Sequence, residues 1–217
     1  MSSQIWWYAA RSGGIVAWVM VTASVCWGLL LSTRAASKAS PPAQLLDLHR
    51  YFGMSALVFT AVHIVGLVAD SYTHFGWLEV LVPWTSQWQA SNVAWGVIAF
   101  YLLISVELTS LVMKRLPRPV WRNIHRASFG LYVLATVHGM RAGSDTSNVW
   151  YRMTMLASIN VVAFLTVLAV LAHRPRESAR GASGEAAGDG RPVRVPAAAR
   201  QAAAAQPGSP PRQIRAS

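Results

Sequence analysis

The sequence predicts an all-α integral membrane protein, a helical bundle of about five transmembrane helices with a disordered C-terminal tail. Hydrophobic residues make up 53% of the 217 residues and charged residues only 12%, whereas a soluble domain carries roughly 25% charged residues. The mean hydropathy of the chain is positive. A helix needs about 20 mostly apolar residues to cross the hydrocarbon. Five runs meet that requirement: residues 14–31, 46–69, 93–113, 120–140 and 150–172.

The segments around these runs have their own signatures. We expect residues 1–13 to be an N-terminal interfacial segment, because Trp6, Trp7 and Tyr8 are aromatics of the kind that anchor at membrane surfaces. The connection formed by residues 71–92 lacks Lys and Arg but is rich in Trp and Leu. This composition predicts an amphipathic segment that lies on the outer surface of the membrane.

The C-terminal residues 173–217 consist largely of Ala, Pro, Gly and Arg, with almost no bulky apolar side chain. Such a segment cannot bury enough surface to offset the entropy of ordering its backbone, which predicts a disordered, basic cytoplasmic tail. Cys26 is the single cysteine of the chain, so an internal disulfide and a cysteine metal cluster are excluded.

Positive charge sets the predicted orientation. The formal net charge is +11, but Lys and Arg lie mainly in short loops and in the tail, where they act as topology signals. We therefore expect membrane lipid and no nucleic acid as a partner. The clusters after the first run, between the third and fourth runs and after the fifth predict a multi-pass protein of the cell membrane, with its N-terminus outside and its C-terminus in the cytoplasm. The minor exceptions are Arg11, Arg141 and Arg152.

The second and fourth runs each contain two histidines, in HRYFGMSALVFTAVH (49–63) and HRASFGLYVLATVHG (125–139). His49 and His63 lie 14 positions apart, and His125 and His138 lie 13 apart, which is about 20 Å along a helix. Histidines that share one metal ion on a helix are spaced i, i+4. These residues therefore occupy two depths of the bilayer.

The predicted topology makes the second and fourth runs parallel, so His49 is level with His125 near the inner face and His63 is level with His138 nearer the outer face. Each cross-helix pair can hold a planar macrocycle whose iron is bound axially by two imidazoles. A helix turns by about 100° per residue, so residues 14 apart, such as His49 and His63, lie within about 40° of the same face. Residues 13 apart, such as His125 and His138, point in directions about 140° apart. Helical phase therefore supports the arrangement in the second run but not in the fourth. The fourth run therefore needs a local distortion, a different tilt or a side chain that reaches around, and Gly130 or Gly139 would ease a distortion.

Arg50 and Arg126 each follow an inner histidine. An arginine just inside the hydrocarbon needs a partner or must snorkel to the surface. Haem propionates would be suitable partners, because guanidinium binds carboxylate through two hydrogen bonds. The alternative is that both arginines reach lipid phosphates as positive-inside anchors.

These residues resemble the ferric reductase-like transmembrane domain, the haem-bearing core of NADPH oxidases and ferric reductases. The histidine spacings, the stretch WRNIHR (121–126) and the stretch HGMRAGSDT (138–146) carry the resemblance, which covers about residues 5–172. It implies that residues 14–172 form a bundle holding two b-type haem (heme b) groups, with His49, His63, His125 and His138 as iron ligands, and an oxidoreductase role in transmembrane electron transport.

The sequence departs from the larger relatives in having five apparent spans rather than six, and in having a tail without a dinucleotide-binding fingerprint. We therefore expect the protein to depend on a separate cytoplasmic or quinol electron donor and to deliver electrons to an outer-face acceptor.

A second hypothesis is a non-redox, multi-span metal-ion permease or membrane helper subunit that uses the histidines as ion ligands. It requires polar residues along a path, for which the spans offer Asp47, Glu107 and Asn160. Asp70 and Asp145, near the outer ends of the histidine runs, could meet a metal or a partner, although a cap or a loop hydrogen bond is the favoured interpretation. His74 and His173 receive no role.

Overall fold

The computed structural model describes residues 2–33, 42–71 and 75–173. Within these ranges the chain is helical and contains no strand. The predicted tail beyond residue 173, together with His74, lies outside the described residues. In chain order the elements are α1 Ser2–Ser32, α2 Pro42–Ala69, α3 Trp77–Leu81, α4 Ala90–Leu111, the 3-10 turn η2 Met113–Arg115, α5 Arg118–Arg126, α6 Ser128–Ala142 and α7 Val149–His173.

Four helices in the described part of the chain are long and apolar enough to cross a membrane: Gln4–Ser32, Ala43–Ala69, Ala90–Leu111 and Val149–Ala172. The prediction of a helical membrane bundle is therefore confirmed, and the chain is a multi-pass membrane protein. The expected interfacial segment is continuous with the first span, because α1 already begins at Ser2.

The fourth predicted span, residues 120–140, is not one continuous helix. The chain forms two shorter helices there, α5 and α6, which are joined at Ala127. The amide of Ala127 donates to the carbonyl oxygen of Ile124 at 2.9 Å, three residues back, which tightens the helix into a turn. The run of α5 residues, RPVWRNIHR, is too polar to continue the apolar face of α6. Within residues 118–142, the apolar character that a membrane helix requires begins only with α6.

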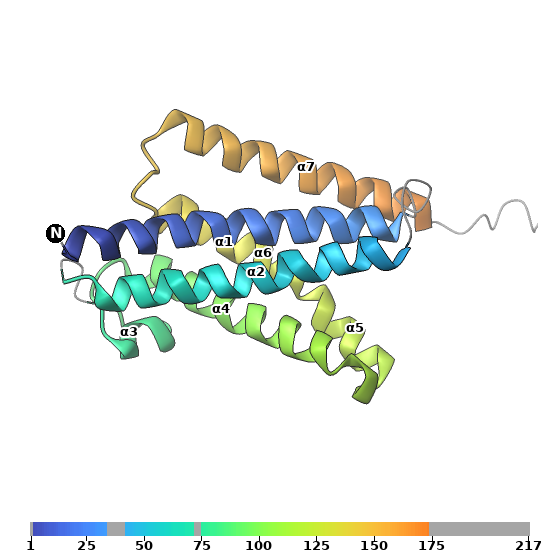
Figure 1. Cartoon of the computed structure of the whole chain (residues 1–217). Helices are drawn as coiled ribbons and strands as arrows, with labels where there is room; N and C mark the ends of the chain where they lie inside the picture. Colours follow the sequence, from blue (N-terminus) through green and yellow to red (C-terminus); the bar gives the residue numbers. More distant parts are fainter. Residues whose placement is uncertain (1, 34–41, 72–74, 174–217) are drawn as a thin grey trace, which may run out of the picture. The chain divides into compact units, whose positions relative to one another are not determined.

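Helix α1 is central to the packing of the described helices, and α1 and α2 run antiparallel, side by side (Figure 1). Their backbones approach closely at two glycines. A Cβ added at Gly66 would lie 2.6 Å from the amide nitrogen of Ala10, and one added at Gly13 would lie 3.0 Å from that of His63. Small residues at an interface allow such close approach between membrane helices. Close packing at Gly13 thus fixes the register of α2 against α1 directly beside His63.

The buried core between the helices is apolar. It contains Val21, Val25, Leu29, Ala56, Ala99, Leu103, Leu131, Tyr132, Val162 and Ala169. Helix α4 packs mainly against α6, whereas α7 packs against α1 (Figure 1).

The predicted amphipathic connection contains the short helix α3. Val80 is buried against Phe75, whereas the side chains of Trp77 and Leu78 are 58% and 65% exposed. The hydroxyl of Tyr101 on α4 donates to the carbonyl oxygen of Leu81 at 2.8 Å and so ties α3 to the bundle. This arrangement gives α3 one buried face and one exposed apolar face, which suits a membrane surface.

Candidate functional site

The four histidines form two pairs, one at each end of the bundle. His63 on α2 faces His138 on α6, with ring centres 6.3 Å apart and ring planes 76° apart. We call this the α3-side pair, because it lies at the end that carries α3. His49 on α2 faces His125 on α5, at 6.0 Å and 74°, and we call this the α5-side pair. The structure therefore contains the two cross-helix pairs that the sequence predicts.

The break between α5 and α6 resolves the problem of helical phase. On one straight helix, residues 13 apart point in directions about 140° apart. His125 lies on α5 and His138 on α6, so the turn at Ala127 redirects one relative to the other. The expected distortion exists, but it is located at neither Gly130 nor Gly139, both of which lie within α6.

The spacing within each pair matches two imidazoles on opposite sides of a metal. A metal–imidazole nitrogen bond is about 2 Å and the ring centre lies about 1 Å further back, so two such rings have centres about 6 Å apart. The observed spacings are 6.3 Å and 6.0 Å. With ring planes at 76° and 74°, the same distances also fit edge-to-face packing of the two rings.

The α3-side rings have defined protonation. Nδ1 of His63 lies 2.6 Å from the carbonyl oxygen of Ala10, and Nδ1 of His138 lies 2.8 Å from that of Asn92. A carbonyl oxygen can only accept a hydrogen bond, so each Nδ1 carries the proton and each Nε2 carries a lone pair. A metal-binding histidine in proteins is held by a donor bond of this kind from its other nitrogen.

The α5-side rings are held differently. Nδ1 of His49 lies 3.4 Å from the hydroxyl oxygen of Ser24, which is long for a hydrogen bond. Nδ1 of His125 is buried and has no hydrogen-bond partner among the described residues, and the same is true of Nε1 of Trp121. The rings of Trp121 and His125 are stacked, with centres 5.1 Å apart and planes at 20°. Stacking therefore holds His125 where hydrogen bonding does not.

Three glycines lie directly against histidine rings, and the sequence analysis did not single them out. A Cβ added at Gly14 would lie 2.8 Å from Nδ1 of His63, and one added at Gly96 would lie 2.7 Å from Nδ1 of His138. At Gly28 the nearest atom would be Cε1 of His49, at 3.2 Å. A signal was present in the sequence, since SVCWG (24–28) and NVAWG (92–96) share a pattern that ends in Trp-Gly.

Each pair lines a cavity. The α3-side cavity has a volume of about 430 Å³ and includes His63 and His138 in its wall. The α5-side cavity has a volume of about 230 Å³ and includes His49 and His125. Two buried leucines, Leu103 and Leu131, line both cavities. They form an apolar partition between the two sites.

The polar residues predicted near the α5-side pair lie in different places in the structure: some line the cavity and one does not. Arg126 lines the α5-side cavity, as does Glu107, whose carboxylate lies against Gly53. Arg50 is on the surface, where its guanidinium pairs with Asp47 at 3.3 Å, and it is not part of the cavity wall. Of the two predicted propionate-binding arginines, the structure brings only Arg126 to the site.

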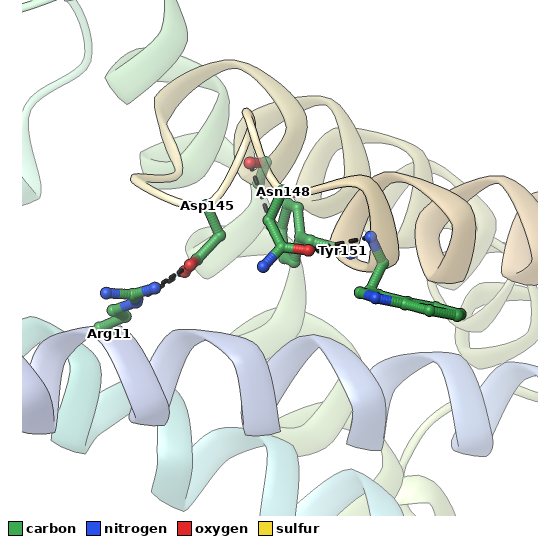
Figure 2. Close-up of polar contacts among 6 residues, drawn as sticks. Arg11, Asp145, Asn148 and Tyr151 are labelled. Carbon is green, nitrogen blue, oxygen red and sulfur yellow. Dashed lines mark hydrogen bonds and ion pairs between the residues drawn. The ribbon is translucent and has the colours of Figure 1, made fainter.

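An ion pair between α1 and the loop that follows α6 lines the α3-side cavity (Figure 2). Nε of Arg11 donates to Oδ2 of Asp145 at 2.6 Å, and its terminal nitrogen contacts Oδ1 of the same carboxylate. The guanidinium also lies 4.8 Å from the ring centre of Trp7. The loop interaction favoured for Asp145 is therefore present, and its partner is one of the arginines that depart from the positive-inside pattern.

The loop between α6 and α7 is ordered by further hydrogen bonds (Figure 2). Oδ1 of Asn148 accepts from the amide of Trp150 at 2.9 Å and caps the start of α7. The hydroxyl of Tyr151 donates to the carbonyl oxygen of Gly139 at 3.1 Å. Gly139 directly follows His138, the ligand candidate on the α3 side. Asp70 is buried in the wall of the same cavity.

Comparison with known proteins gives one result. A family model described as "Ferric reductase like transmembrane component" matches residues 13–136. The matched segment contains His49, His63 and His125 and ends two residues before His138. No curated protein and no solved structure matches the chain.

Proposed function

Because the chain belongs to the family of ferric reductase-like transmembrane components, we propose that it is a b-type di-haem membrane protein that passes electrons across the bilayer to an outer acceptor. His63 and His138 would hold one haem iron at the α3 side, and His49 and His125 would hold the other at the α5 side. A cytoplasmic donor or a quinol supplies the electrons.

The observation that carries this proposal is the distance between the ring centres of each pair, 6.3 Å and 6.0 Å. Both distances match those expected for two imidazoles that bind one metal ion, and each pair lines a cavity. Within the described residues no hydrogen bond occupies Nε2 of any of the four histidines. Among the described residues, the Nε2 atoms therefore have no competing hydrogen-bond partner.

Haem, when bound, supplies a one-electron Fe(III)/Fe(II) couple whose potential depends on the axial ligands and their surroundings. The chain's own residues determine those surroundings. The carbonyl oxygens of Ala10 and Asn92 hold the protons on Nδ1 of the α3-side rings. Leu103 and Leu131 contribute buried apolar side chains to the walls of both cavities.

Charge distribution supports the orientation in which the α3 side faces outward. The arginines of α5 lie at the opposite end, as the positive-inside rule requires of cytoplasmic segments. Arg11, Arg141 and Arg152 lie at the α3 side as exceptions, and Asp145 neutralises Arg11. Arg126 lines the α5-side cavity, where its guanidinium would suit a carboxylate group such as a haem propionate.

The metal-permease hypothesis receives less support from the geometry. Asp47 is exposed and paired with Arg50, and the side-chain amide of Asn160 donates to the carbonyl oxygen of Leu156 on its own helix. Glu107 alone, among the three polar residues that this hypothesis invokes, lines a cavity. No group of three or more His, Cys, Asp or Glu side chains in the described ranges could hold one metal ion.

The test is haem stoichiometry in protein purified from haem-replete cells. We expect two b-type haems per chain and the absorption bands of reduced b-type haem. His63→Ala and His138→Ala should each remove one and the same haem, and His49→Ala and His125→Ala the other. His74→Ala is the matched control and should retain both. A colourless wild type, or four variants that all retain two haems, would refute the proposal.

A further inference from the structure

We infer that helices α1 and α4 orient three of the four histidines through one repeated module, in which a hydrogen-bond acceptor is followed four residues later by glycine. This inference rests on the proposed haem function, because it assigns positioning residues to the haem ligands. The modules are Ala10 with Gly14 for His63, Ser24 with Gly28 for His49, and Asn92 with Gly96 for His138.

The spacing has a physical reason. In an α-helix the carbonyl oxygen of residue i points toward residue i+4 and accepts its amide. The side chain at i+4 leans back over the preceding turn, so it covers that oxygen from the side. A glycine at i+4 leaves the oxygen uncovered. Because a carbonyl oxygen has two lone pairs, it can then accept a second hydrogen bond from a neighbouring helix.

The two α3-side modules show this arrangement fully. The carbonyl oxygens of Ala10 and Asn92 accept from histidine Nδ1 atoms at 2.6 Å and 2.8 Å. A Cβ added four residues later, at Gly14 or Gly96, would come within 2.8 Å or 2.7 Å of the same nitrogen atoms. Real Cβ atoms essentially never lie under 3.0 Å from such a neighbour. The hydrogen bond and the ring position therefore both require glycine.

The register of α1 against α2 repeats the module at the right interval. Gly14 and Gly28 lie 14 positions apart on α1, as His63 and His49 do on the antiparallel helix α2. Fourteen residues return to nearly the same face of a helix. One face of α1 thus holds both histidines of α2.

These glycines differ from those that only allow helices to pack. At Gly13 and Gly66 an added Cβ would meet mainly backbone atoms of the neighbouring helix. At Gly14, Gly28 and Gly96 the three nearest atoms all belong to an imidazole ring. A substitution at these three positions acts on the ring itself, and so on the angle between the two ring planes of a pair.

The three modules differ in how closely the acceptor and the glycine approach the ring, and His125 has no such module. At Gly28 the nearest ring atom is 3.2 Å away, and the Ser24 hydroxyl is 3.4 Å from Nδ1 of His49. His125 is stacked on Trp121 instead. We therefore expect substitutions of glycine to perturb the α3-side pair more than the α5-side pair.

The experiment compares Gly14→Ala, Gly96→Ala and Gly28→Ala in the full-length, haem-loaded protein. Gly130→Ala is the matched control on α6, because its nearest neighbour would be Cδ1 of Leu102 at 3.9 Å. The readouts are haem stoichiometry, the midpoint potential of each haem and the low-spin ferric electron paramagnetic resonance signal. The g-values of that signal report the angle between the two axial imidazole planes, which a purely structural defect would not change selectively.

Gly14→Ala and Gly96→Ala should shift the signal, or cause loss, of the same haem that His63→Ala removes, and leave the other haem unchanged. Gly28→Ala should shift only the haem that His49→Ala removes, and by less. Gly130→Ala should shift neither. If the two α3-side variants do not assemble, Gly28→Ala decides the question, since its added Cβ meets a milder contact of 3.2 Å.

Haem-loaded variants with unchanged signals, or with equal shifts at both haems, would overturn the module while the proposed function stands. A wild type that binds no haem would overturn the proposed function, and the inference with it. The two failures are thus distinguished by the wild-type haem content alone.

Discussion

The α3-side and α5-side pairs have nearly the same ring spacing, 6.3 Å and 6.0 Å, but different support. Both α3-side rings donate to backbone carbonyl oxygens at 2.6 Å and 2.8 Å. At the α5 side, His49 has a contact of 3.4 Å to the Ser24 hydroxyl and Nδ1 of His125 has no described partner. The comparison separates two effects. The placement of the helices sets the distance between the ring centres, and hydrogen bonds to Nδ1 determine how firmly each ring is held.

The difference in support has an energetic consequence. A hydrogen bond contributes about 0.5–1.5 kcal/mol, and a buried polar group left without one costs about 1–3 kcal/mol. Outer-shell partners of metal ligands commonly change metal affinity by about 10–100-fold. The α5-side pair should therefore be the weaker of two otherwise similar sites, and the following predictions test that ranking.

The largest expected effect is at Trp121, the stacking partner of His125. Trp121→Ala should lower the free energy of unfolding by about 2 kcal/mol, less than the about 3–5 kcal/mol of a fully buried tryptophan because Trp121 is only half-buried. It should also release the α5-side haem. Trp121→Phe keeps the stack and removes an unpaired N–H, so it should retain this haem. Detergent unfolding curves and haem content measure both effects, and equal behaviour of the two variants would contradict the stacking argument.

Next in size is the difference in haem affinity between the two sites. We expect the α5-side haem to transfer to an excess of apomyoglobin at a concentration at which the α3-side haem is retained, with affinities about 10-fold apart. Spectra of the His63→Ala and His49→Ala variants identify which haem has left. Simultaneous loss of both haems, or earlier loss at the α3 side, would reverse the ranking.

The ion pair at the α3-side cavity should have a smaller effect. Asp145→Asn leaves the half-buried Arg11 without its charge partner and should cost about 1 kcal/mol, between the values for exposed and buried pairs. The matched control is Asp47→Asn, which breaks an exposed pair with Arg50 and should change stability by less than about 0.5 kcal/mol. Thermal unfolding in detergent compares them. Equal losses would show that the ion pair at this cavity has no special role.

The smallest effect is expected for Ser24→Ala. The hydroxyl of Ser24 lies 3.4 Å from Nδ1 of His49, too far for a strong hydrogen bond. Its removal should change the free energy of unfolding by less than about 0.5 kcal/mol. It should raise the midpoint potential of the α5-side haem slightly, because a weaker acceptor makes the imidazole a less basic ligand. A large change would mean that this contact is stronger than its length indicates.

Several features of this protein follow directly from its sequence. The apolar runs predicted four of the membrane helices, because the length of a spanning helix is set by the bilayer rather than by neighbouring residues. The pairing of His49 with His125 and of His63 with His138 followed from charge topology and residue spacing alone. Alternating crossings make the second and fourth segments parallel, whatever their detailed packing.

Other features depend on the tertiary structure. The turn at Ala127, the pair between Arg11 and Asp145 and the glycines that support the rings join residues that are distant in the sequence or change direction within a run. Hydropathy is averaged over a window of residues, so it cannot locate a turn within an apolar run. The role of a glycine in a helix depends on which atoms of the neighbouring helix lie against it, and the sequence does not show those atoms. The sequence determined the order and approximate extent of four apolar helices and the spacing between the histidines. The tertiary structure decided which atoms hold each ring, because those contacts depend on ångström-scale approach between helices that local composition does not encode.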